Sequence, residues 1–137
     1  LSYYLNYIFD DVRLIRSDSV TESIEEIHRI GDEDVIIAIS FPRYSVKTIQ
    51  TVSFAKNRKA KIIAITDGAQ SPLAKYADCS IYAGSDMVSF VDSLVAPLSV
   101  VNVLLAALSM RYKDSVTDTM LSMESIWNTM NEYEHID

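Results

Sequence analysis

Two short runs of uninterrupted apolar residues constrain this chain more than any other feature. Residues 35–39 read Val-Ile-Ile-Ala-Ile, and residues 61–66 repeat the pattern as Lys-Ile-Ile-Ala-Ile-Thr. A strand of a parallel sheet is apolar on both faces because helices cover both faces, whereas a half-exposed antiparallel strand alternates apolar and polar residues. The two runs therefore predict parallel strands covered on both faces in an α/β fold.

Helical segments alternate with strand segments along the rest of the chain. The spacing of apolar and capping residues predicts helices at residues 3–9, 19–31, 45–58, 88–112 and 116–133, with a short one that opens at Ser71 and Pro72. Further strands are expected at residues 12–15 and 80–83. This alternation predicts a doubly wound, flavodoxin-like parallel sheet with helices on both faces, followed by a C-terminal helix.

The last expected helix is strongly one-sided. Its apolar residues recur at intervals of four and three, and they are Val116, Met120, Met123, Trp127 and Met130. Such a stripe predicts packing, either within the chain or against a second copy. The apolar stretch before it, residues 88–108, is interrupted by polar residues and a proline. We interpret that stretch as a buried helix and not as a membrane span.

Composition narrows the class of protein. A chain of 137 residues, 49% of them hydrophobic, is long enough for one compact domain. Its net charge of −7 argues against direct binding to nucleic acid, which needs clustered Lys and Arg. The single cysteine, Cys79, cannot form a disulfide within the chain. We therefore expect a cytoplasmic protein.

The loop at residues 40–48 carries the richest chemistry. In an open parallel sheet, ligands bind beyond the carboxyl ends of the strands, where loops lead into helix N-termini that favour anions. Here Ser40, Ser45 and Thr48 supply hydroxyls, and Arg43 supplies a guanidinium. These groups suit a phosphate. The residues alone leave two interpretations open, an anion site or an ordinary helix cap.

The same loop resembles a known family. It reads Ser-Phe-Pro-Arg-Tyr-Ser at residues 40–45, and it is followed by Thr-Asp at residues 66–67 and Ser-Pro-Leu-Ala at residues 71–74. In order and spacing these motifs resemble the SIS (sugar isomerase) domain of the RpiR family of bacterial transcription regulators, over about residues 12–108. The first motif is fairly specific to the regulators, whereas the other two occur more widely among SIS domains.

This resemblance implies a domain that binds a sugar phosphate effector and assembles into a homodimer or homotetramer. It implies that DNA is bound only by a helix-turn-helix domain that this chain lacks. The residues implied to bind the phosphosugar are Ser40, Arg43, Tyr44, Ser45, Thr48, Thr66 and Ser85. Compared with the family, residues 1–137 are expected to form a single SIS-type domain that lacks its first strand.

The resemblance also leaves catalysis to be weighed, because some SIS domains are isomerases. An isomerase needs a general base such as Glu or His near the sugar. His28 lies among charged residues and His135 lies close to the last residue, and two histidines so far apart predict no metal site. We expect no catalytic residue and no cofactor. A phosphosugar sensor is favoured, with an isomerase and a dimerisation module with a vestigial pocket as the alternatives.

Overall fold

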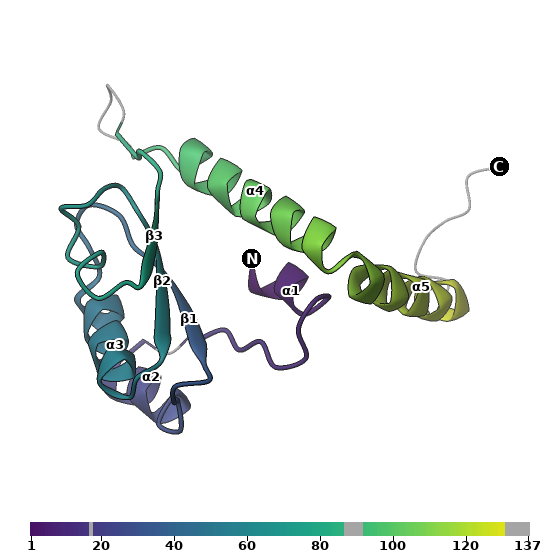
Figure 1. Cartoon of the computed structure of the whole chain (residues 1–137), viewed down its shortest axis with the longest axis horizontal. Coiled ribbons are helices and arrows are strands. Elements are labelled where there is room, and N and C mark those ends of the chain that lie inside the picture. Colours follow the sequence, from purple (N-terminus) through teal and green to yellow (C-terminus); the bar gives the residue numbers. More distant parts are fainter. Residues whose placement is uncertain (17, 87–91, 131–137) are drawn as a thin grey trace. The chain divides into compact units, whose positions relative to one another are not determined.

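The computed structural model describes residues 1–16, 18–86 and 92–130. The chain divides into two compact units, and Figure 1 shows their elements. Unit 1 comprises Leu1–Leu14 and Val101–Asp137, and unit 2 comprises Ile15–Val100.

Unit 2 is built on a parallel sheet. Within the described residues the sheet has three strands in the order β1 (Val35–Ile39), β2 (Lys61–Thr66) and β3 (Cys79–Tyr82). Ile36 of β1 pairs with Ile62 of β2, and the next residue of β2, Ile63, pairs with Cys79 of β3. The two apolar runs are therefore neighbouring parallel strands, and the predicted parallel α/β class is confirmed.

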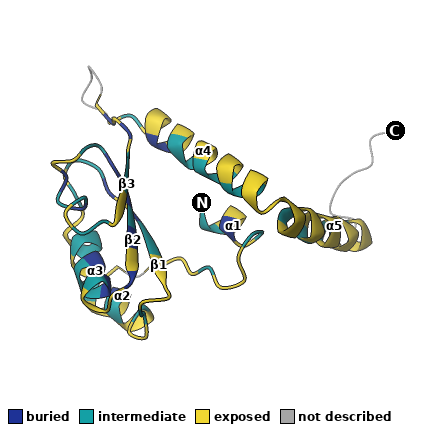
Figure 2. Cartoon of the chain, viewed as in Figure 1, coloured by how far each residue is buried: buried dark blue, intermediate teal, exposed yellow. Residues whose placement is uncertain are grey.

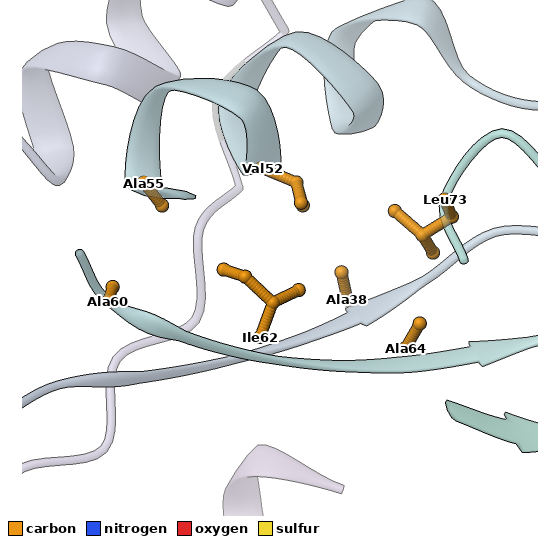
Figure 3. Packing of buried hydrophobic residues seen from close by; sticks show 7 residues of the cluster. All are labelled: Ala38, Val52, Ala55, Ala60, Ile62, Ala64 and Leu73. Atoms are coloured by element: carbon orange, nitrogen blue, oxygen red, sulfur yellow. The ribbon is translucent and has the colours of Figure 1, made fainter. Parts of the chain in front are cut away.

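The core of unit 2 lies between the sheet and helix α3 (Val46–Asn57). This helix packs on β1 and β2, and helix α2 (Val20–Glu26) packs against α3. Figure 3 shows the packed side chains, which are Ala38, Val52, Ala55, Ala60, Ile62, Ala64 and Leu73. Small alanines on the facing surfaces let the helix approach the strands closely. The strand register and the site at the carboxyl ends of the strands are thus fixed by a dry core.

The first expected strand is absent, and β1 is less covered than its sequence predicts. Residues 11–16 belong to no strand, so the prediction for residues 12–15 is wrong. Apolar β-type residues form a strand only when a neighbour pairs with them. Within the described residues β1 pairs with β2 alone, and Val35 is 57% exposed, because an edge strand has fewer neighbours to cover it.

Local hydrogen bonds account for most shifted helix boundaries. The cap at Ser19 forms as predicted, because its Oγ accepts a hydrogen bond from Glu22 N at 3.2 Å. However, α2 ends at Glu26, because the C-cap residue Ile27 has a ψ of 16°, and Gly31 lies beyond it. The segment after Ser71 is a series of turns, not a helix, because Ala74 N donates to Ser71 O, a bond of the i to i−3 type.

Unit 1 consists of helices. Helix α1 (Ser2–Leu5) is a single turn, shorter than expected, and turns follow it. Helix α4 (Val95–Arg111) begins in unit 2 and ends in unit 1, where α5 (Lys113–Met130) follows. Residues 88–91 and 131–133, which we expected to be helical, lie outside the described residues. Helices are present at the other expected places, although residues 92–94 precede α4 as irregular chain and the segment after Ser71 is not helical.

The two long helices carry much exposed apolar surface. Pro97 is the sole buried residue of α4, and α5 has none, as the yellow and teal ribbons of Figure 2 show. The prediction of a buried helix is therefore wrong for this chain, because most residues of α4 are apolar but the described chain covers only part of the helix. On α5 the predicted packing stripe is only partly covered, because Val116, Met123 and Trp127 are half-buried whereas Met120 and Met130 are 46% and 68% exposed.

Within the described residues, no single helix is long and apolar enough to span a membrane. Only α4 and α5 taken together reach such a length, and they are bent by 98°.

Candidate functional site

The carboxyl ends of the three parallel strands meet at one edge of the sheet. Ser40 follows β1, Thr66 is the last residue of β2, and Ser85 lies three residues beyond β3. All three side chains are buried. The structure therefore brings three of the predicted site residues to the same edge, the edge at which α3 begins.

Hydrogen bonds from buried hydroxyl groups connect the loops at this edge of the sheet. Thr66 Oγ1 lies 2.7 Å from the carbonyl oxygen of Ser40 and 2.8 Å from Ser71 Oγ. Ser71 Oγ also accepts a hydrogen bond from Leu73 N at 3.2 Å. Because Thr66 has no exposed surface, its side chain serves to hold these loops together. This hydrogen-bond network holds the loops at this edge in fixed positions relative to one another.

The first turn of α3 is capped by its predicted hydroxyls. Ser45 is the N-cap, and its Oγ accepts a hydrogen bond from Thr48 N at 3.2 Å. Ser40 Oγ in turn accepts a hydrogen bond from Ser45 N at 3.2 Å. Both hydroxyls act as acceptors in these bonds, and neither donates to another of the described residues. Each therefore keeps a hydrogen that it can donate to an anion at the positive end of the helix.

Tyr44 ties the loop after β1 to the residue after β2. Its Oη donates to the Asp67 carboxylate, at 2.9 Å from Oδ1 and 3.0 Å from Oδ2. Desolvation raises the pKa of the Tyr44 phenol above its ordinary value, and the nearby carboxylates of Asp67 and Asp86 raise that pKa further. The phenol therefore keeps its proton at neutral pH and holds Asp67 in place.

Arg43 occupies an unusual backbone position with its side chain in solvent. Its φ is 66°, in the left-handed region that few residues other than glycine adopt. Its Nη2 lies 2.8 Å from Asp92 Oδ2, and the side chains of Arg43 and Asp92 are 86% and 51% exposed. The segment that carries Asp92 is anchored, because Ser93 N donates to Ser85 O at 2.8 Å. The guanidinium thus lies in solvent, and the backbone beside its partner is hydrogen-bonded to Ser85.

Sequence reasoning did not assign a role to three residues of this arrangement. Asp67 and Ser71 stand inside the motifs that pointed to the family, so the signal for them was present. Asp92 is separated from Arg43 by 49 positions, and no local pattern predicts their contact.

The arrangement suits binding better than acid–base chemistry. Among the described residues no group of three His, Cys, Asp or Glu residues could hold a metal ion. His28 lies far from the candidate site, since its backbone oxygen is 3.5 Å from the guanidinium of Arg58, at the opposite end of α3. Near the capped helix start lie hydroxyls, the guanidinium of Arg43 and three carboxylates. Asp67 is engaged by Tyr44 and Asp92 by Arg43, and Asp86 lies near Tyr44.

Comparison with known proteins gives a family model and regulator relatives. The model of the SIS domain matches residues 15–107. An uncharacterized HTH-type transcriptional regulator of Caldanaerobacter subterraneus is 31% identical over an aligned stretch of 105 residues, and the match covers 69% of this chain and 37% of that protein. One from Haemophilus influenzae is 29% identical over 94 residues, 66% of this chain and 33% of that protein. The chain thus spans about a third of the length of these relatives.

Two solved structures share the fold. The sugar isomerase domain of the RpiR transcription factor from Sphaerobacter thermophilus is 25% identical, with a TM-score of 0.80 over 90% of this chain and 69% of that one. The NanR protein of Vibrio vulnificus, solved in complex with ManNAc-6P, is 21% identical, with a TM-score of 0.71 over 91% of this chain and 49% of that one.

Proposed function

The chain belongs to the SIS domain family, as its resemblance to the RpiR regulators predicts, and from this premise we propose that it senses a sugar phosphate for a bacterial transcription regulator. The observation that carries the proposal is the capped start of α3, where the hydroxyls of Ser40 and Ser45 keep hydrogens to donate. The names of the two curated relatives and the ManNAc-6P bound to NanR support it.

The phosphate of the effector would lie at the first turn of α3. Ser40 and Ser45 donate hydrogen bonds there, Arg43 reaches it from the preceding loop, and Thr48 lies on the same turn. Charge-assisted hydrogen bonds contribute roughly 1.5 to 3 kcal/mol each. A few of them give a binding free energy of about −4 to −8 kcal/mol, which corresponds to a millimolar to micromolar dissociation constant and suits a metabolite sensor.

The sugar would extend from the phosphate toward the loops after β2 and β3. Thr66, which is wholly buried, and Ser85 shape this part of the site through the loops that they hold. Tyr44 and Asp67 form its wall and stay bonded to each other. We propose a binding function without catalysis, because the carboxylate of Asp67 is engaged by Tyr44 and that of Asp92 by Arg43.

We further propose that unit 1 assembles the protein with a second copy of itself. Residues 95–110 of α4 contain no charged residue, and Val103 and Met110 are 68% and 81% exposed. An apolar groove of about 540 Å³ also lies within unit 1, between residues of α4, α5 and the first eight residues. Stable homodimers bury such apolar surface, whereas a surface without charge offers no electrostatic selection for a different partner.

A thermal unfolding series tests the sensor proposal. The chain is heated with ManNAc-6P, glucosamine 6-phosphate, glucose 6-phosphate or ribose 5-phosphate, each beside the unphosphorylated sugar. A ligand at about 100 times its dissociation constant stabilises the fold by roughly 2.7 kcal/mol. We expect one phosphorylated sugar to raise the melting temperature and its unphosphorylated form to leave it unchanged. No shift with any phosphorylated sugar would refute sensing of these ligands and favour a dimerisation module.

A further inference from the structure

The ion pair between Arg43 and Asp92 is the feature of the site that the proposed function does not yet use. It joins the loop before α3 to the segment that leads into α4, through a single contact of 2.8 Å. Among the described residues the other ion pairs are Arg13 with Asp11 and Lys56 with Asp78, so no other salt bridge involves the loop at residues 40–45. Arg43 thus already has an anionic partner without a ligand.

The exposure of this pair makes it easy to exchange. An ion pair in solvent contributes little to stability, because water screens it and both side chains lose freedom. A phosphate monoester carries close to two charges and three strong acceptor oxygens, and a guanidinium can bind two of them at once. A phosphate at the start of α3 would therefore attract Arg43 more strongly than the carboxylate does.

We infer that Asp92 is an internal competitor of the effector's phosphate for Arg43, and that it sets the effector concentration at which the site responds. This inference rests on the proposed function, because it needs a phosphate at the start of α3. Asp92 itself makes no bond to the effector, and its presence lowers the affinity of the site for the effector. Asp92 is a regulatory residue, not a ligand.

The position of Asp92 gives the exchange a consequence. The neighbouring Ser93 remains bonded to Ser85 through its backbone, and α4 begins at Val95. When Arg43 moves to the phosphate, the side-chain link between the phosphate loop and the segment before α4 is lost. By thermodynamic linkage, whatever strengthens that link weakens effector binding by the same factor.

A double-mutant cycle measured by isothermal titration calorimetry tests the inference. ManNAc-6P is titrated into the wild-type chain, Asp92→Asn, Arg43→Gln and the double variant at constant ionic strength, after each variant is shown to be folded by circular dichroism. We expect Asp92→Asn to bind about two- to fivefold more tightly, the range set by an exposed ion pair. In the Arg43→Gln background the same substitution should change the affinity by less than about twofold.

A neighbouring carboxylate provides the matched control. Asp86 raises the pKa of Tyr44 and so lies near the site, yet it forms no ion pair with the described residues. Asp86→Asn removes the same charge without freeing Arg43, so it should tighten binding by less than Asp92→Asn does. Glucose 6-phosphate and inorganic phosphate are titrated as second and third probes.

The outcomes separate this inference from the proposed function. If the wild type binds but Asp92→Asn binds more weakly, Asp92 positions Arg43 and the inference is overturned alone. If Asp86→Asn increases the affinity as much as Asp92→Asn does, the effect is one of general electrostatics and the inference is overturned. The same holds if Asp92→Asn still increases the affinity in the Arg43→Gln background. If neither the wild type nor Asp92→Asn binds any probe, the proposed function fails and the inference fails with it.

Discussion

The two units of this chain use apolar residues in opposite ways. In unit 2 the side chains of Ile62, Leu73 and Val52 are buried between the sheet and α3. In unit 1 the end of α4 is just as apolar in sequence, yet Val103 and Met110 of this helix are exposed to solvent. The difference matches the two proposed roles. Unit 2 has a packed apolar core and carries the candidate ligand site, whereas unit 1 leaves apolar surface exposed, which we propose is covered by a second copy.

Truncation of a core side chain should have the largest effect. Leu73 has no exposed surface and packs in the cluster of Figure 3, so Leu73→Ala should lower the free energy of unfolding by about 2 to 5 kcal/mol. The cost should not depend on protein concentration, because the core lies within unit 2. Urea unfolding followed by circular dichroism at two concentrations measures it. A cost below about 1 kcal/mol would show that this core is not closed.

A charged residue introduced on α4 should weaken the association of this chain with a second copy. Met110→Lys puts an ammonium on the exposed apolar helix of unit 1, and we expect it to weaken self-association about tenfold or more, equivalent to ~1.4 kcal/mol. The control is Gln50→Lys, which adds the same charge at an exposed position of α3. Sedimentation equilibrium measures both. A wild type that stays monomeric at high concentration, or equal effects of the two variants, would contradict the role given to unit 1.

Loss of the helix cap should cost less. Ser45→Ala removes the acceptor for Thr48 N and should lower stability by about 1 kcal/mol, within a range of 0.5 to 2. Ser122→Ala on the exposed surface of α5 is the control and should change stability by less than about 0.5 kcal/mol. Chemical denaturation without ligand compares them. Equal effects would mean that the Ser45 hydroxyl does not stabilise the start of α3.

The smallest expected effect is a loss of folding stability that appears only at acidic pH. Asp78 accepts hydrogen bonds from Lys56 Nζ at 2.7 Å and from Ile62 N at 2.8 Å, and these bonds lower the pKa of its carboxyl group. A lowered pKa in the folded state stabilises the protein above the unfolded pKa of about 3.9, and that stability is lost as the pH falls through the lower folded value.

The wild type should therefore lose stability more steeply below about pH 4 than Asp78→Asn does. Thermal unfolding between pH 2.5 and 6 measures the two slopes. If the melting temperatures of the two proteins fall in parallel as the pH is lowered, Asp78 does not contribute to the loss of stability in acid.

The fold was predictable where the decisive chemistry lies within one segment. The apolar runs at residues 35–39 and 61–66 and the cap at Ser45 need only their own residues and nearest neighbours. Prediction failed where a distant partner decides. Residues 12–15 have the composition of a strand but no pairing neighbour, and the exposure of α4 depends on what covers it. No local sequence pattern predicts the contact between Arg43 and Asp92, which are 49 positions apart.

The central claim is that the ligand binds at the carboxyl edge of the sheet in unit 2, and backbone NMR tests it most directly. ManNAc-6P is added to the isotopically labelled chain, and amide shift changes are mapped onto the sequence. We predict that the largest changes fall at residues 40–48 and 66–71, while Trp127 and the groove of unit 1 stay unchanged. Changes concentrated around the groove, at Tyr3, Leu105 and Trp127, would contradict the account and move the ligand site to unit 1.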